Sequence, residues 1–150
     1  MNKKEIEVFF SPEDNCSGAI IKIISQATKK IDICVFTITD DNISRAIKKA
    51  SDRGVKIKII TDNDKAYDKG SDIYLLAKEG INVVVDVENQ WMHHKFAIFD
   101  GKTVLSGSYN WTRSAGRQNE NIIIINNSDV ALRFEREFFK LWKEFQKNFL

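Results

Sequence analysis

The chain has 150 residues, 43% of them hydrophobic and 29% charged, and these proportions are ordinary for a globular protein and exclude a disordered chain. The length suits one domain over residues 1–150. Lys and Arg number 23 against 21 Asp and Glu, so the net charge of +2 does not by itself indicate a nucleic-acid partner. The first residues contain no uninterrupted apolar segment and the longest apolar runs are strand-sized, so we expect a cytoplasmic protein without stable membrane association.

The first half of the chain alternates between strand and helix patterns. In chain order, the expected elements are an edge strand at residues 5–10, a helix at 17–27, a buried strand at 31–37, a helix through apolar residues 43–50 that ends before Gly54, and a strand at 55–60. This alternation predicts the α/β class, with a mixed, largely parallel central β-sheet flanked by helices on both faces.

The second half begins the same way and then changes. A short helix around Ile73 and Leu76 ends near Gly80, and a strand follows at residues 81–87. Four consecutive isoleucines at 122–125 predict a strand that is covered on both faces and lies centrally in the sheet. After capping residues 127–129, apolar residues at spacings of three and four predict one long amphipathic helix that reaches Phe149 and packs on the sheet.

The segment from residue 93 to residue 110 carries the groups that a phosphodiester reaction needs. His93 and Lys95 are two apart at the start of a predicted strand, so their side chains share one side. A hairpin turn at residues 100–101 returns the chain and brings Ser108 and Asn110 beside them. An imidazole is a nucleophile near neutral pH, a lysine supplies positive charge, and the hydroxyl and amide can donate to phosphate oxygens. The sequence therefore predicts a phosphodiester site that uses no metal.

The spacing His-x-Lys-x4-Asp-x6-Gly-Ser-x-Asn, from His93 to Asn110, resembles the HKD motif of the phospholipase D superfamily. A chain of this length with one copy resembles the small EDTA-resistant bacterial endonucleases and their mitochondrial relatives, which work as dimers. The resemblance implies a phospholipase D/nuclease-like fold and a homodimeric phosphodiesterase without cofactor. In such an enzyme His93 would form a covalent phosphohistidine, and the partner's His93 would protonate the leaving oxygen.

The resemblance also assigns roles to individual residues. Glu120 would hold the second ring nitrogen of the nucleophile, while Asp100 is expected to support the turn rather than touch substrate. His94 is expected to point to the opposite side of the strand. Counting Asp100 as a motif residue with this supporting role, the predicted catalytic set is His93, Lys95, Asp100, Ser108, Asn110 and Glu120, and the predicted substrate-binding set is Lys95, Ser108, Asn110, Trp111, Arg113 and Arg117.

Several alternatives stay open. The preferred reading is an endonuclease acting on DNA or RNA, and the alternatives are a phospholipid hydrolase or, less favoured, a nucleic-acid-binding module with weak catalysis. No metal site is expected, because adjacent histidines on a strand point apart and residues 62–68 have Tyr67 where a calcium loop requires glycine. Cys16 and Cys34 are expected to be reduced structural thiols.

Overall fold

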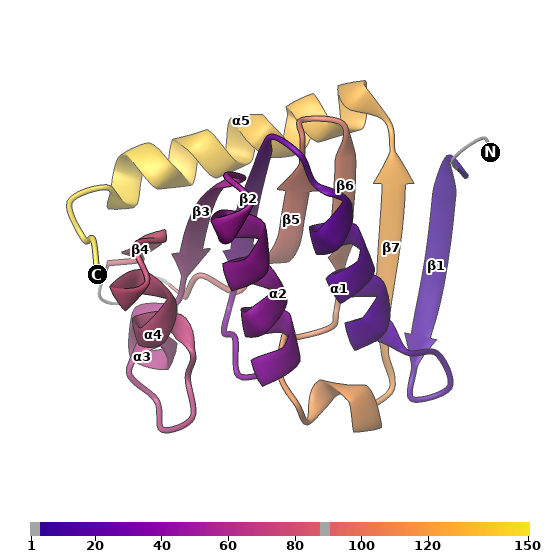
Figure 1. The fold of residues 1–150 in the computed structure, drawn as a ribbon, viewed down its shortest axis with the longest axis horizontal. Helices are drawn as coiled ribbons and strands as arrows, with labels where there is room; N and C mark the ends of the chain where they lie inside the picture. Colours follow the sequence, from indigo (N-terminus) through magenta and orange to yellow (C-terminus); the bar gives the residue numbers. More distant parts are fainter. Residues whose placement is uncertain (1–3, 88–90) are drawn as a thin grey trace.

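The computed structural model describes residues 4–87 and 91–150 and contains one seven-stranded sheet with helices on both faces (Figure 1). The elements, in chain order, are β1 (Ile6–Ser11), α1 (Cys16–Gln26), β2 (Lys30–Val35), α2 (Asp41–Asp52), β3 (Lys56–Thr61), α3 (Asn63–Ala66), α4 (Ile73–Lys78), β4 (Asn82–Val85), β5 (Lys95–Phe99), β6 (Thr103–Gly107), the 3-10 turn η1 (Ala115–Arg117), β7 (Glu120–Asn126) and α5 (Ser128–Phe145). The predicted α/β class with a mixed sheet is therefore confirmed.

The strand order is β1-β7-β6-β5-β2-β3-β4. The pairs β2–β3 and β3–β4 are parallel, whereas β5 and β7 run against their neighbours on both sides. Most strands therefore share one direction, as the sequence predicts, but most neighbouring pairs are antiparallel. The reason is that β2, β3 and β4, which are joined through helices, occupy one side of the sheet, while the β5–β6 hairpin, β7 and β1 fill the other.

The two faces of the sheet are covered unequally. Helices α1 and α2 pack on one face with their buried isoleucines, and α5 crosses the other (Figure 1). The buried residues under α5 come from β6, β5, β2, β3 and β4, because the helix leaves β7 and crosses toward the opposite edge. Consequently, no helix within residues 4–87 and 91–150 covers the outer part of this face, over β7 and β1.

This coverage corrects the prediction for residues 122–125. Strand β7 is second from the edge, not central, and Ile123 and Ile125 are only half-buried, whereas Ile122 and Ile124 are buried under the α1 face. The predicted edge position of β1 is confirmed. A continuous apolar run therefore does not here mark a strand with two covered faces.

The end of the last helix also differs from the sequence prediction. Helix α5 ends at Phe145, and Phe149 instead forms an antiparallel bridge with Val84. Leu150 N donates to Val83 O at 3.1 Å, and Val85 N donates to Asn148 O at 3.1 Å. The chain leaves the helix because β4 is an edge strand whose open backbone groups these residues satisfy.

Candidate phosphodiester site

The start of the motif is held by contacts from three separate parts of the chain. His94 O accepts a hydrogen bond from Phe36 N at 2.9 Å, at the end of β2. One residue before His93, Met92 is buried, and its N–H donates to the buried carboxylate of Asp86 at 2.9 Å. The same carboxylate accepts from Asn63 N at 2.7 Å, so Asp86 links β4, α3 and the motif. These bonds determine where His93 enters the site.

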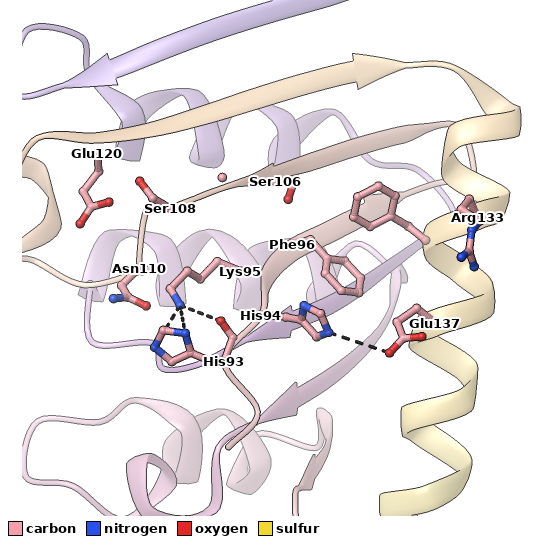
Figure 2. A pocket seen from close by; sticks show the side chains of 12 residues that line it. His93, His94, Lys95, Phe96, Ser106, Ser108, Asn110, Glu120, Arg133 and Glu137 are labelled. Carbon is pink, nitrogen blue, oxygen red and sulfur yellow. Dashed lines mark hydrogen bonds and ion pairs between the residues drawn. The ribbon is translucent and has the colours of Figure 1, made fainter. Parts of the chain in front are cut away.

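The side chains of His93 and Lys95 meet, as their spacing predicts (Figure 2). Lys95 Nζ lies 3.2 Å from His93 Nδ1 and 3.5 Å from Nε2, and it donates to His93 O at 2.7 Å. An ammonium group can only donate, so the imidazole is the acceptor in this pair. Burial lowers the pKa of Lys95, and the negative charge of Glu120 opposes this effect.

An aromatic ring that the sequence analysis did not single out completes this cluster. Phe36 meets His93 edge-on, with 4.8 Å between the ring centroids, and Lys95 Nζ lies over the same ring at 5.5 Å. Lys65 Nζ also lies over the Phe36 ring, 5.8 Å from its centroid. Edge-to-face and cation–π contacts of this kind hold both partners in orientation. The only signal for Phe36 in the sequence was its position at the end of a predicted buried strand.

The returning strand brings Ser108 and Asn110 to the same place through a close approach to β7. A Cβ atom on Gly107 would lie 2.1 Å from Asn121 O, so only glycine fits here. Ser108 Oγ accepts from Asn121 N at 3.0 Å, which leaves the exposed hydroxyl hydrogen available for a phosphate oxygen. Asn110 Oδ1 is buried and finds no hydrogen-bond partner among the described residues.

These groups open into one cavity of about 820 Å³ beside α5 (Figure 2). Its lining consists of His93, His94, Lys95, Phe96, Ser106, Gly107, Ser108, Asn110, Glu120, Arg133, Phe134 and Glu137. The structure thus gathers five of the six predicted catalytic residues. Glu120 faces this cavity, but within the described chain it makes no hydrogen bond to His93, so its orienting role stays a prediction. The sixth residue, Asp100, lies elsewhere.

Asp100 is at the opposite end of β5 from His93, in the hairpin turn. Lys102 N donates to Phe99 O at 3.0 Å, and Asp100 and Gly101 both have positive φ angles of 54° and 65°, as in a type I′ turn. The Asp100 carboxylate accepts from the backbone N–H groups of residues 28–30 at 2.8–3.3 Å. Asp100 is therefore corrected from a catalytic to a structural position, which agrees with the supporting role expected for it.

The hydrogen bonds to the Asp100 carboxylate together have a larger effect on its pKa than its desolvation. Partial burial acts to raise its pKa, but the N–H donors from Thr28, Lys30 and Lys29 lower it overall. Because the folded-state pKa is depressed, this stabilisation is present above the unfolded-state pKa and is lost as the pH falls through the folded-state pKa.

We expect Asp100→Asn to lower the free energy of unfolding at pH 7 by about 1–2 kcal/mol, since asparagine tolerates the positive φ but loses the charged acceptor. Urea unfolding measured from pH 7 down to pH 3 would test this. The difference between wild type and variant should shrink below about pH 4. A difference that is constant across this range would contradict the electrostatic origin.

The predicted substrate-binding residues fall into two groups. Lys95, Ser108 and Asn110 line the cavity, whereas Trp111, Arg113 and Arg117 do not. Trp111 is fully buried in the core and pairs with Ile38 in a β-bridge, so the expectation that it contacts substrate is wrong. Packing between the sheet and the loop, rather than substrate, explains this tryptophan. Arg113 and Arg117 are exposed but do not line the cavity, and Arg113 is paired with Asp41 at 2.7 Å.

His94 turns to the other side of the strand, as predicted, but it still lines the cavity. Its ring rests edge-on against Phe96 at 5.3 Å, and Nε2 lies 3.9 Å from Glu137 Oε1 on α5 (Figure 2). The cavity therefore has a reactive end around His93 and a second end around His94, Arg133 and Glu137. Nothing in the local sequence pattern indicated that α5 would contribute.

We expect Phe36→Leu to lower kcat roughly 5- to 10-fold with little change in KM, because a leucine fills the space but loses the oriented aromatic contact with His93. Phe36→Tyr, which keeps the ring, should restore most of the rate. Steady-state kinetics on a chromogenic phosphodiester would measure both. Equal losses for leucine and tyrosine would indicate a packing role only.

In the part of the chain that the structure describes, no group of three or more His, Cys, Asp or Glu side chains is arranged to hold a metal ion. No helix within residues 4–87 and 91–150 combines the length and apolar character needed to cross a bilayer.

The fold and the gathered motif define a phospholipase D-like α/β domain. A family model described as "Cardiolipin synthase, PLD-like domain" matches residues 20–142, and the chain belongs to this family. It is 44% identical to the mitochondrial cardiolipin hydrolase of Chlamydomonas reinhardtii over 82% of this chain and 56% of that protein. The human mitochondrial cardiolipin hydrolase is 35% identical over 88% of this chain and 53% of that protein. The chain thus spans little more than half the length of these two relatives.

Solved structures of similar size agree with the fold. The phospholipase D family member Nuc from Salmonella typhimurium superposes with a TM-score of 0.87 and 28% identity, over 93% of this chain and 95% of that one. NucT from Helicobacter pylori gives a TM-score of 0.86 and 27% identity, over 93% and 96%. The cytoplasmic location expected from the sequence stays a prediction.

Proposed function

We propose that the protein is a metal-independent phosphodiesterase, and specifically an endonuclease acting on DNA or RNA. The observation that carries the proposal is the convergence of His93, Lys95, Ser108 and Asn110 on one cavity. Together they offer a nucleophile, a positive charge and two hydrogen-bond donors, which are the groups that stabilise a pentacovalent phosphorus.

The reaction would proceed in two displacements. A ring nitrogen of His93 attacks phosphorus, the bond to the departing oxygen breaks, and that oxygen takes a proton from His93 of the partner subunit. Water then attacks the phosphohistidine, its proton passes to the same imidazole of the partner, and the phosphorus–nitrogen bond breaks. Lys95, Ser108 and Asn110 hold the nonbridging oxygens throughout.

This mechanism requires a second histidine. The other histidine of the chain, His94, lies on the other side of the strand and therefore cannot serve. A homodimer supplies the second histidine. The uncovered part of the sheet is where we place the partner. Val8, Ile123 and Ser106 are cross-strand neighbours on its face, so this surface runs from the edge strand to the cavity. Ser106 on β6 lines the cavity, and beyond β7 the edge strand β1 exposes the large apolar side chains of Ile6, Val8 and Phe10. A partner docked over β1 and β7 would cover this patch and approach the site.

A phospholipid hydrolase is the second candidate. It is favoured by the names of the curated relatives, which are cardiolipin hydrolases. The charged residues at the α5 end of the cavity favour the nuclease instead, since Arg133, Glu137 and His94 would have to be desolvated beside an acyl chain.

A substrate panel separates the two. Wild type is assayed on labelled single-stranded DNA, duplex DNA, RNA and cardiolipin vesicles, each with excess EDTA and with His93→Ala as the blank. We expect EDTA-resistant cleavage of at least one nucleic acid, because the positive charge comes from Lys95 and the imidazoles. Hydrolysis of the vesicles alone would overturn the nuclease reading, and loss of all activity in EDTA would overturn the metal-independent mechanism.

A further inference from the structure

The cavity is larger than the reaction at phosphorus requires. Its volume of about 820 Å³ far exceeds one phosphodiester group, and it extends from His93 along the sheet to α5 (Figure 2). At that end Arg133 and Glu137 lie one helical turn apart and both line it. A substrate that fills the cavity therefore places a second part of itself against α5.

Whether a cation near the cavity can bind an anion depends on whether it is already paired with a carboxylate. Near the site, Arg113 pairs with Asp41 and Lys65 pairs with Asp68, each at 2.7 Å. Arg133 is exposed and makes no ion pair within residues 4–87 and 91–150, even though Glu137 is four residues further on. Its guanidinium group therefore lines the cavity without an ion-pair partner among the described residues.

The nearby carboxylate does not cancel this charge. Glu137 Oε1 lies 3.5 Å from Lys140 Nζ and 3.9 Å from His94 Nε2, so the cation that forms an ion pair with it is Lys140 and not Arg133. A guanidinium group offers a planar fork of donors that matches two oxygens of a phosphate. An anion at the α5 end would consequently meet Arg133 with little competition.

We propose that Arg133 binds a second phosphate of a polynucleotide substrate while His93 acts on the scissile one. The proposal rests on the nuclease function above and adds a binding site to it. A nucleic-acid strand carries a phosphate at every nucleotide, so a strand that runs through the cavity delivers one to each end. The phosphate at Arg133 contributes to binding and register and takes no part in the chemistry.

The test uses substrates in which only the number of phosphates differs. Short oligothymidylates carry a p-nitrophenyl phosphodiester at one end, either 3′ or 5′, so that release of p-nitrophenolate reports one defined bond. Each series contains a form with that phosphate only, a form with two further phosphates, and a form in which the further phosphates are neutral methylphosphonates. Wild type is compared with Arg133→Met, and with Arg136→Met, an exposed arginine on α5 that does not line the cavity.

In one of the two series, Arg133→Met should lower kcat/KM about 10- to 100-fold on the longer substrate, the range expected for a lost bidentate charge-assisted contact. On the one-phosphate substrate the change should stay within about twofold. The methylphosphonate form should show no effect of the substitution, because combining the change at Arg133 with the change at the phosphate isolates the interaction between the two charged groups. Arg136→Met should change none of the rates. Circular dichroism and thermal melting check that each variant is folded.

Three outcomes would overturn the proposal. An equal loss on the one-phosphate substrate would make Arg133 part of the catalytic or folding machinery, and no loss in either series would exclude the contact. The same variants are also assayed on vesicles of cardiolipin, which carries two phosphates, and of phosphatidylcholine, which carries one; loss of cardiolipin hydrolysis alone in Arg133→Met would assign the second phosphate to a lipid. If wild type releases p-nitrophenolate from the one-phosphate form but cleaves no nucleic acid, the proposed nuclease function fails instead.

Discussion

Replacement of His93 by alanine is expected to lower kcat by at least about 10⁴-fold on every phosphodiester substrate, since in the proposed mechanism it removes the nucleophile and also the proton donor that each subunit gives its partner. Binding should persist, because Lys95, Ser108 and Asn110 remain to hold the phosphate. Steady-state kinetics and fluorescence anisotropy with a labelled oligonucleotide would measure the two effects separately.

His94→Ala is the matched control for this substitution. It removes an adjacent imidazole that lines the same cavity but lies against Phe96 and Glu137. It should leave kcat within about tenfold of wild type, since no covalent step passes through it. A comparable loss in both variants would contradict the assignment of His93 as nucleophile.

The second large effect concerns assembly. Val8→Glu combined with Phe10→Glu places two charges on the apolar patch of β1, and we expect this variant to be monomeric at micromolar concentration and at least about 100-fold less active. The reason is that carboxylates buried in an apolar interface without partners cost several kcal/mol. Sedimentation equilibrium would report the oligomeric state.

Tyr74→Glu combined with Leu75→Glu provides the control. These side chains lie on α4 and are 50% and 59% exposed, close to the 47% and 59% of Val8 and Phe10. The control should keep the wild-type assembly and rate. A dimer that survives the β1 substitutions would place the interface elsewhere, and a fully active monomer would refute the shared site.

Local patterns in the sequence were sufficient for most of the elements and for the meeting of His93 with Lys95. The spacing of His93 and Lys95 predicts that they share one side, because side-chain direction along an extended segment depends only on the backbone repeat. The turn at Asp100 and Gly101 is equally local, since it depends on two residues that tolerate positive φ. The types of most helices and strands follow for the same reason.

Tertiary structure decided what covers each element and what reaches the site. The four isoleucines of β7 look like a central strand, but one face remains uncovered because α5 crosses toward the other edge. Trp111 beside the motif resembles a substrate contact, yet it is buried against Ile38. Phe36 contacts His93 and Arg133 lines the cavity, and both come from segments far from the motif in the sequence. Burial and convergence depend on strand order and helix path, which are long-range contacts that local periodicity does not encode.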